Sequence, residues 1–346
     1  MRTILASEPL LADGVPFDVR ARVAAEVIAR LPDVADFEQI KRHARDEQGL
    51  RPVLVGPGHR YAAMDLIGAK ADATVVFVPG ARAFISDIDR YSGNVFAVRR
   101  SLRRDAGPKI RTVVWAGHDV PGTSFMWTHD GSRVCTGGVA LADFIGAIRA
   151  EEGPDHRIIV DGFSLGASIA AMMAVVLAAR GDEPVEAVIM GGCPGVPYDD
   201  LAQLGMPVDR VFTHRSANDV CGCGVLGHDP HSDELSSCLD IPIPGIRHVP
   251  PRAIEGAPFN RYVDFLVSLI AHGEAGDFVA KHRKRSRVEL GGVGFRQLRR
   301  SRRRNLALYG KFLEDLPAPA PVPAPAPAPA TSRRVARARR ARMLAS

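Results

Sequence analysis

Residues 158–170 read I-I-V-D-G-F-S-L-G-A-S-I-A, an apolar run that leads into a glycine–serine–glycine turn and then into small residues. The apolar run predicts a buried strand, and residues 167–180 predict a helix. G-x-S-x-G between a strand and a helix is typical of a sharp turn that exposes a serine, because Cβ atoms at the glycine positions would collide with the flanking backbone. We therefore predict Ser164 as a nucleophile and the N–H of Leu165 as an oxyanion donor at the helix N-terminus. An ordinary strand-to-helix turn is the alternative interpretation.

Strands and helices alternate on both sides of this turn. Apolar runs predict strands at 52–56, 62–68, 73–78, 110–117, 185–190 and 208–214, with a last short one near 241–246. Helical spacing predicts a helical N-terminal region within 15–48, broken near Pro32, and helices at 87–103, 138–152 and 259–273. Residues 221–246, rich in Gly, Pro, Cys and His, are expected to be mainly loop. Such alternation predicts an α/β fold with a mostly parallel sheet flanked by helices.

Length and composition allow one large domain with extensions. The chain has 346 residues, 46% of them hydrophobic, and no apolar stretch reaches the length of a membrane-spanning helix. The N-terminus lacks the apolar core of a secretory signal, so we expect a cytoplasmic protein, with peripheral association with a membrane as an alternative. The five cysteines are an odd number and do not indicate a disulfide framework.

Charge divides the chain into an acidic body and a basic end. Residues 277–346 hold eighteen Lys/Arg and four Asp/Glu, a net charge of +14 that leaves −8 for the remainder. The proline-alanine repeat within this end predicts an extended spacer. We expect the following regions: helical N-terminal region 1–50, α/β domain 51–275, basic and partly helical extension 276–316, and disordered linker and tail 317–346. The tail could bind an anionic membrane surface or envelope polymer; nucleic acid is disfavoured because few aromatic residues are available for stacking.

A nucleophilic serine needs an acid, placed after it in the chain at the exit of a strand. Asp219 meets this requirement because it follows the predicted strand 208–214, and we favour it over Asp209, which precedes most of that strand. An Asp in a turn is the alternative interpretation of Asp219.

The base should follow the acid, and three histidines compete for this role. We favour His248, which comes after one more strand-like segment, with His228 as the alternative base and His231 as a further competitor. The loop after strand 73–78 should supply the second oxyanion donor, and Ala81, next to Gly80, is the candidate.

A zinc site is the competing interpretation of the loop at 221–246. Cys221, Cys223, His228, His231 and Cys238 are all possible zinc ligands. We disfavour it because the C-x-C spacing is unusual for a structural zinc site and no second close cysteine pair follows. No metal and no cofactor is predicted.

Several motifs in this order resemble those of an actinobacterial α/β-hydrolase family of unknown function. The resemblance covers residues from about Arg51 to Asp264. Its motifs are V-F-V-P-G at 76–80, W-A-G-H-D-V-P at 115–121, G-F-S-L-G at 162–166, G-C-P-G-V at 192–196, and Asp219, G-H-D-P at 227–230 and His248. The chain departs from the family pattern at Phe163, where the usual elbow has His, and at Cys193, where it has Ser. The resemblance implies the α/β-hydrolase fold and hydrolysis of an ester or related acyl substrate.

These observations give two hypotheses of function. The first is a serine hydrolase that cleaves an ester, thioester or related acyl substrate through a Ser-His-Asp triad and an acyl-enzyme. The second is a catalytically inactive binding module of the same fold that presents its basic tail to an anionic partner.

Overall fold

A computed structural model gives the structure of the chain in the following segments. The described residues are 15–31, 38, 40–42, 49–56, 60–81, 88–105, 107–118, 130–214, 225–230, 236–239, 241, 251–279 and 292–316.

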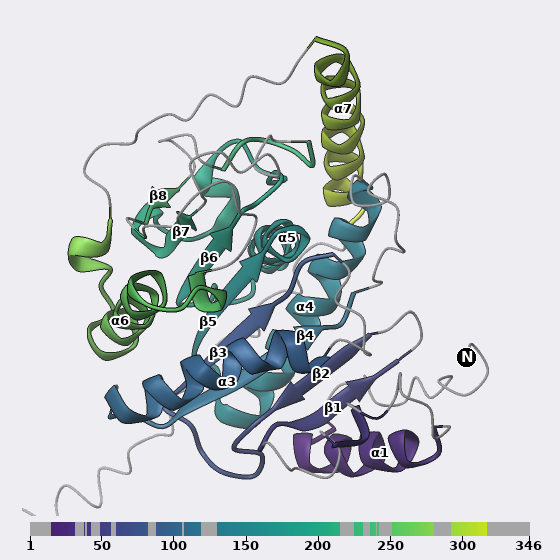
Figure 1. Cartoon of the computed structure of the whole chain (residues 1–346). Coiled ribbons are helices and arrows are strands. Elements are labelled where there is room, and N and C mark those ends of the chain that lie inside the picture. Colours follow the sequence, from purple (N-terminus) through teal and green to yellow (C-terminus); the bar gives the residue numbers. More distant parts are fainter. Residues whose placement is uncertain are drawn as a thin grey trace, which may run out of the picture.

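The described residues form an eight-stranded sheet in the order β1-β2-β4-β3-β5-β6-β7-β8 (Figure 1). The strands are β1 (Arg51–Val55), β2 (Tyr61–Met64), β3 (Ala73–Val78), β4 (Ile110–Ala116), β5 (Arg157–Phe163), β6 (Ala187–Gly191), β7 (Val211–His214) and β8 (Ser237–Cys238). β2 is antiparallel to both of its neighbours, and the pairings from β4 through β8 are parallel. The prediction of a mostly parallel sheet is confirmed, and the carboxyl ends of its parallel strands share one edge.

Helices cover both faces of the sheet (Figure 1). They are α1 (Phe17–Ala29), α3 (Ile88–Asp105), α4 (Gly131–Glu152), α5 (Leu165–Arg180), α6 (Ala257–His272) and α7 (Gly292–Glu314), with short 3₁₀ segments η5 (Leu201–Leu204), η6 (Val208–Arg210), η8 (Pro251–Ala253) and η9 (Gly276–Phe278). Alternate strand residues enter separate cores: Val76 and Val78 pack with α4 and α5, whereas Val75 and Phe77 pack with α3 and α6. Both sheet faces are therefore buried, as the continuously apolar strands require.

The end of the sheet beyond β7 differs from the sequence prediction. Residues 221–246 were expected to be mainly loop, but Ser237–Cys238 within them forms β8, parallel to β7. The N–H of Leu239 continues this pairing by donating to Thr213 O at 2.8 Å. Two residues are too few to give a sequence pattern, so the pairing depends on the neighbouring strand. Apart from Ile241, the strand expected near 241–246 lies outside the described residues.

Helix α7 packs against α4 rather than standing apart from the domain (Figure 1). Asn305 is buried; its Oδ1 accepts from the N–H of Gly131, the first residue of α4, at 3.2 Å, and its Nδ2 donates to Val225 O at 3.2 Å. The hydroxyl of Tyr309 donates to Leu226 O at 2.8 Å. These bonds join α7 to the start of α4 and to the segment at 225–228, both near the carboxyl edge of the sheet.

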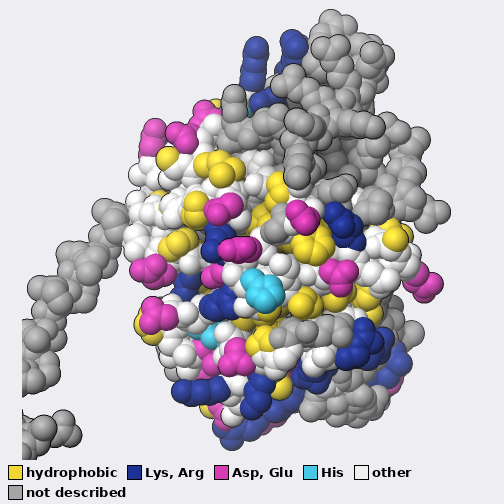
Figure 2. Space-filling view, turned by 90° about the vertical axis from the view of Figure 1, so that its left-hand side faces the viewer, with side chains coloured by type: hydrophobic (Ala, Val, Ile, Leu, Met, Phe, Trp, Pro, Cys, Tyr) yellow, Lys and Arg dark blue, Asp and Glu magenta, His cyan; other side chains and the backbone are white. Residues whose placement is uncertain are grey.

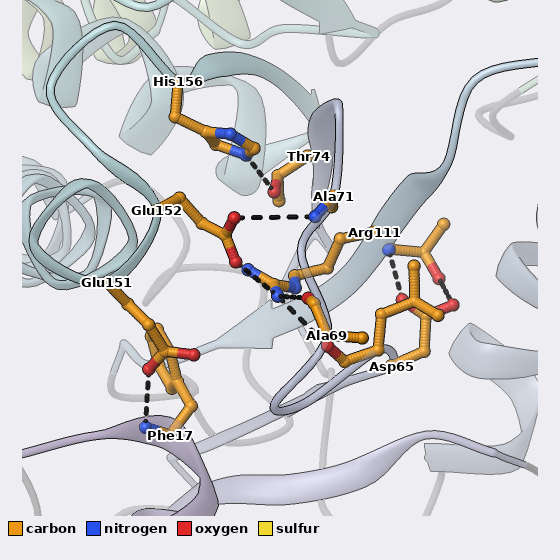
Figure 3. Close-up of polar contacts among 11 residues, drawn as sticks. Phe17, Asp65, Ala69, Ala71, Thr74, Arg111, Glu151, Glu152 and His156 are labelled. Carbon is orange, nitrogen blue, oxygen red and sulfur yellow. Dashed lines mark hydrogen bonds and ion pairs between the residues drawn. The ribbon is translucent and has the colours of Figure 1, made fainter.

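A buried polar network ties the amino ends of β3 and β4 to the end of α4 (Figure 3). Arg111 is fully buried; it pairs with Glu152 at 2.6 Å and donates to the carbonyls of Leu66 and Ala69 at 3.1 and 2.8 Å. Asp65 accepts from the N–H of Thr112 at 2.7 Å. Backbone groups that leave the sheet at this edge are thus satisfied by charged side chains.

The outer surface seen from the side of α6 intersperses acidic and basic side chains with scattered hydrophobic ones (Figure 2). In the part of the chain that the structure describes, no helix is long and apolar enough to cross a membrane.

Candidate functional site

Ser164 stands at the strand-to-helix turn that the sequence predicted. Its backbone has φ 56° and ψ −125°, a region that L-residues with a side chain rarely occupy. The turn is held by two backbone bonds: Ser164 N donates to Gly191 O at 2.8 Å, and Ala167 N donates to Ser164 O at 2.9 Å. Ser164 is partly exposed, while Leu165 behind it is buried. Strain of this kind persists only where the surroundings fix it, and such strain concentrates at functional sites.

The glycines of the turn leave no space for a side chain. A Cβ atom at Gly166 would lie 2.3 Å from Val78 O and 2.4 Å from Pro79 O, and one at Gly162 would lie 2.4 Å from Gly166 O. These separations are far below van der Waals contact, so any larger residue would have to move the backbone. The sharp turn is therefore built by close contact between β3, β5 and the first turn of α5.

The loop that follows β3 lies against the Ser164 side chain. A Cβ atom at Gly80 would lie 2.7 Å from Ser164 Cβ and 3.3 Å from Ser164 Oγ. Ala81, the predicted second oxyanion donor, is the next residue and is partly exposed. Leu165, the predicted first donor, opens α5, where the N–H groups have no acceptor within the helix. The geometry thus brings both candidate donor segments to the predicted nucleophile.

The predicted acid and base, Asp219 and His248, lie outside the described residues, so their roles stay predictions. Strand β7, which precedes Asp219, ends at His214, whose imidazole packs against Gly191: a Cβ there would lie 2.4 Å from His214 Cε1. Gly191 is also the acceptor for Ser164 N. Asp209 lies on η6, which leads into the amino end of β7. Because β5, β6 and β7 are parallel, Asp209 is at the sheet edge opposite Ser164.

His228, the alternative base, lines a groove at the C-terminal half of α5. This open groove of about 580 Å³ is also lined by Val175 and Ala178 of that helix and by Leu306 of α7. Val175 follows Ser164 by about 11 residues, or roughly 16 Å along a helix axis. The Arg302 guanidinium is 3.4 Å from His228 Nδ1, and burial together with Arg302 lowers the pKa of His228.

The candidate zinc ligands include only one side chain that the structure describes. Cys221, Cys223 and His231 lie outside the described residues, and only the backbone of Cys238 is described, in β8. Among the described residues, no group of three or more potential metal-ligating side chains is present.

A histidine at the carboxyl end of β4 is a feature that the sequence analysis did not single out. His118 is almost fully buried, and neither of its ring nitrogens has a hydrogen-bond partner among the residues that the structure describes. Its ring centroid is 6.0 Å from that of Trp115, whose buried Nε1 likewise has no hydrogen-bond partner in the described part of the chain. Burial, and secondarily the Arg133 charge, lowers the pKa of His118 to about 4. The imidazole is therefore neutral at physiological pH, like a polar group held in a core.

The sequence analysis also missed a buried charged cluster under the turn. Asp161, three residues before Ser164, is fully buried and contacts Arg252 and Tyr262. A carboxylate in an otherwise apolar strand is a signal that could have drawn attention to this position. Its partners, about 90 and 100 residues later in the chain, have no sequence pattern that links them to it.

Comparisons with known proteins agree with this architecture. A family model described as alpha/beta hydrolase matches residues 59–223, which include the Gly80 loop and the Ser164 turn. No curated protein is found to match this chain.

Three solved structures are among those to which the chain is similar. An esterase from Pyrobaculum calidifontis is 13% identical, covers 74% of this chain and 91% of its own, and has a TM-score of 0.42. A Trichoderma reesei cutinase, in complex with a phosphonate inhibitor, is 13% identical, covers 75% of this chain and 93% of its own, and has a TM-score of 0.38. The Francisella virulence factor BioJ is 12% identical, covers 73% of this chain and 90% of its own, and has a TM-score of 0.42. From the strand order, the strained serine turn and the family match, the chain has the α/β-hydrolase fold.

Proposed function

We propose that the protein is a serine hydrolase that cleaves an ester, a thioester or a related acyl substrate. The observation that carries this proposal is Ser164 itself: a partly exposed hydroxyl on a strained turn, with the Gly80 loop against it and a helix N-terminus behind it. An ordinary strand-to-helix turn would need neither the positive φ nor the close approach of a second loop.

In the proposed reaction, Ser164 Oγ attacks the acyl carbonyl while His248 accepts the hydroxyl proton. The N–H groups of Leu165 and Ala81 stabilise the negative charge that develops on the carbonyl oxygen. The C–O or C–S bond then breaks, and His248 protonates the departing alcohol or thiol, leaving an acyl-enzyme. Water, deprotonated by the same histidine, attacks the acyl-enzyme and releases the acid and free Ser164.

The described positions disfavour two of the competitors for acid and base, Asp209 and His228. Asp209 is at the opposite edge of the sheet, and His228 lines the groove at the C-terminal half of α5, with its Nδ1 3.4 Å from Arg302. We therefore keep Asp219 as the residue that orients His248 and fixes its tautomer.

The test uses a fluorophosphonate probe and p-nitrophenyl esters of increasing acyl length. The wild type should be labelled at Ser164 and should hydrolyse at least one ester, whereas Ser164→Ala should lose both activities. Ser168→Ala is the matched control, because Ser168 lies one turn further along α5, is buried and donates to Gly195 O at 2.6 Å. A folded wild type that is neither labelled nor active would overturn the proposal, as would labelling that persists in Ser164→Ala.

His248→Ala and His228→Ala, compared with the same probe, identify the base. We expect the labelling rate to fall by about 100-fold or more in His248→Ala, in line with general-base catalysis. In His228→Ala we expect it to stay near that of the wild type. The reverse result would transfer the role of base to His228.

A second candidate function is the binding module that meets an anionic partner through the basic C-terminal part of the chain. The observation that favours it is the exposed side of α7, which carries Arg299, Arg300, Arg303 and Arg304. Binding to vesicles rich in anionic lipid should weaken with salt and with replacement of these arginines by glutamine. Binding that is insensitive to both changes would exclude it.

A further inference from the structure

A three-residue polar cluster is buried on the α6 side of the nucleophile strand. Asp161 of β5 accepts two short hydrogen bonds at the same carboxylate oxygen, Oδ2: from Arg252 Nη1 at 2.5 Å and from Tyr262 Oη at 2.5 Å. Arg252 belongs to η8 and Tyr262 to α6, so the cluster joins two elements from late in the chain to the centre of the sheet. We refer to Asp161, Arg252 and Tyr262 as the Asp161 cluster.

The cluster contacts both of the strands that end at the proposed site. Asp161 and Phe77 are paired in register across β5 and β3, and the Arg252 guanidinium carbon lies 5.3 Å from the centroid of the Phe77 ring. Gly80 is three residues after Phe77, just beyond the end of β3, and Ser164 is three residues after Asp161, just beyond the end of β5, so about 10 Å of extended chain separates the cluster from the site on each side. One guanidinium thus touches the strand of the nucleophile and the strand of the oxyanion loop.

Burying the charges of the Asp161 cluster costs free energy of desolvation that an apolar core would not require. Burial raises the pKa of Asp161, while the charge of Arg252 and the bond from Tyr262 oppose that rise. Hydrophobic residues of similar volume often serve stability as well as a buried ion pair or better, because the charges must be removed from water. A buried ion pair adds geometric specificity, because its hydrogen bonds form in only one arrangement of the elements that it joins.

We propose that Asp161, Arg252 and Tyr262 are positioning residues of the hydrolase reaction. They fix β3 and β5 relative to each other and to η8, so that the Gly80 loop and Ser164 keep the separation that catalysis needs. The inference rests on the proposed function of Ser164. The cluster acts through the backbone, because it lies between the sheet and α6, and Asp161 is three residues before Ser164. A displacement of about 1 Å at such a site is enough to cost roughly 100-fold in rate.

The test compares two double variants that each remove a buried arginine–carboxylate pair. Asp161→Asn with Arg252→Met removes the charges of the cluster, and Arg111→Met with Glu152→Gln does the same at the amino edge of the sheet, where the pair is also buried. Both proteins are measured by urea unfolding, by kcat and KM on the best p-nitrophenyl ester, and by hydrogen exchange of the peptide 158–170. A second activity variant, Arg252→Lys, keeps the charge but offers a different donor geometry.

We expect kcat to fall about tenfold or more in the Asp161-cluster double variant with KM nearly unchanged, and to stay within about twofold in the amino-edge variant. Arg252→Lys should recover part of the lost kcat. Exchange in peptide 158–170 should accelerate only in the Asp161-cluster variant. Equal loss of kcat in the two double variants, or an unchanged kcat in the Asp161-cluster variant, would overturn the inference.

Failure of the proposed function has a different signature. In that case the wild type neither reacts with the fluorophosphonate nor hydrolyses an ester. Hydrogen exchange alone then tests whether the Asp161 cluster fixes the position of the Ser164 turn. Faster exchange of peptide 158–170 in the Asp161-cluster variant alone would support the coupling between the cluster and the turn. Unchanged exchange would refute it whether or not the protein is an esterase.

Discussion

At the amino ends of β3 and β4, charged side chains hydrogen-bond to the backbone, whereas at the carboxyl ends of β3 and β5 the chain segments pack too closely to leave space for a Cβ atom at Gly166 or Gly80. Arg111 alone contacts Glu152 and two carbonyls at the first edge (Figure 3). At the second edge, Gly166 and Gly80 allow approaches that a single Cβ atom would prevent. The amino edge of the sheet therefore depends on buried ion pairs, and the carboxyl edge depends on glycines that have no Cβ atom.

The two edges of the sheet therefore have different roles: the amino edge contributes to stability, and the carboxyl edge forms the proposed site. A charged network can lose a partner and still leave the chain trace in place, at a cost in free energy. Close backbone contact tolerates no added atom, but it presents N–H groups and a hydroxyl where a substrate can reach them. We therefore expect changes at the amino edge to affect the free energy of unfolding, and changes at the carboxyl edge to affect mainly the rate of reaction.

The largest effect is expected from Gly166→Ala. The added methyl group would lie 2.3 Å from Val78 O, so β3 and α5 must separate and the oxyanion donors must move. We expect kcat/KM to fall by at least about 100-fold, the cost of losing one oxyanion donor. Ester hydrolysis and the rate of fluorophosphonate labelling measure it. A variant that keeps more than about a tenth of the activity would show that the contact is not needed for catalysis.

Arg111→Met should destabilise the fold by about 4 kcal/mol, because it leaves Glu152 buried without its cationic partner. Urea unfolding measures this change, and kcat of the folded protein should stay close to that of the wild type. Asp18→Asn is the control: the pair of Asp18 with Arg22 is exposed, so its loss should cost well under about 1 kcal/mol. A large loss of kcat in Arg111→Met would contradict the division between the two edges.

Acidification should destabilise the wild type through His118. The pKa of His118 is about 4 in the folded protein, below the ordinary value of 6.5, so only the unfolded state takes up a proton between these values. The contribution of His118 to stability is complete above pH 6.5 and decreases by about 3 kcal/mol as pH falls to about 4. Urea unfolding of the wild type and His118→Leu across this range isolates the effect by difference. Parallel pH curves for the two proteins would refute it.

Gly146→Ala should give the smallest effect and the opposite sign. Gly146 lies within α4 and is exposed, and a Cβ atom there would contact nothing within 4 Å. The alanine should therefore stabilise the protein by about 0.5–1 kcal/mol through its higher helix propensity, with activity unchanged. Thermal unfolding and ester hydrolysis test this, and the variant also serves as the control for Gly166→Ala. A destabilised Gly146→Ala would mean that α4 cannot accept an ordinary helix former at this position.

Much of the fold follows from local pattern. The strand at 73–78 was predicted with the bounds of β3, because a continuous apolar run between turn residues has few other interpretations. The Ser164 turn was predicted from its glycines, and in the structure Ser164 has a φ of 56° at a sharp strand-to-helix turn. In both cases a few adjacent residues are enough to determine the local structure.

The secondary structure and the buried contacts were predicted less accurately where they depend on residues distant in the sequence. The helix expected at 138–152 begins at Gly131, and its first turns contain Gly137 and Gly138, which have low helix propensity. In the structure they allow α4 to touch α5: a Cβ at Gly138 would lie 2.4 Å from Met172 Cγ, and one at Gly137 would lie 3.0 Å from Ile169 Cδ1. For the same reason the partners of Asp161 could not be predicted, because only the folded chain brings them together.

The bond between Asn305 and Gly131 has a consequence for the order of events during synthesis. The two residues are 174 positions apart, so the first amide of α4 is made long before the side chain that accepts its hydrogen bond. At about 5–20 residues per second, the ribosome needs roughly 10–35 s to cover that interval. During this time the growing chain already contains Ser164 while the start of α4 lacks its partner from α7. Completion of the carboxyl edge is thus timed by the arrival of the C-terminal helix.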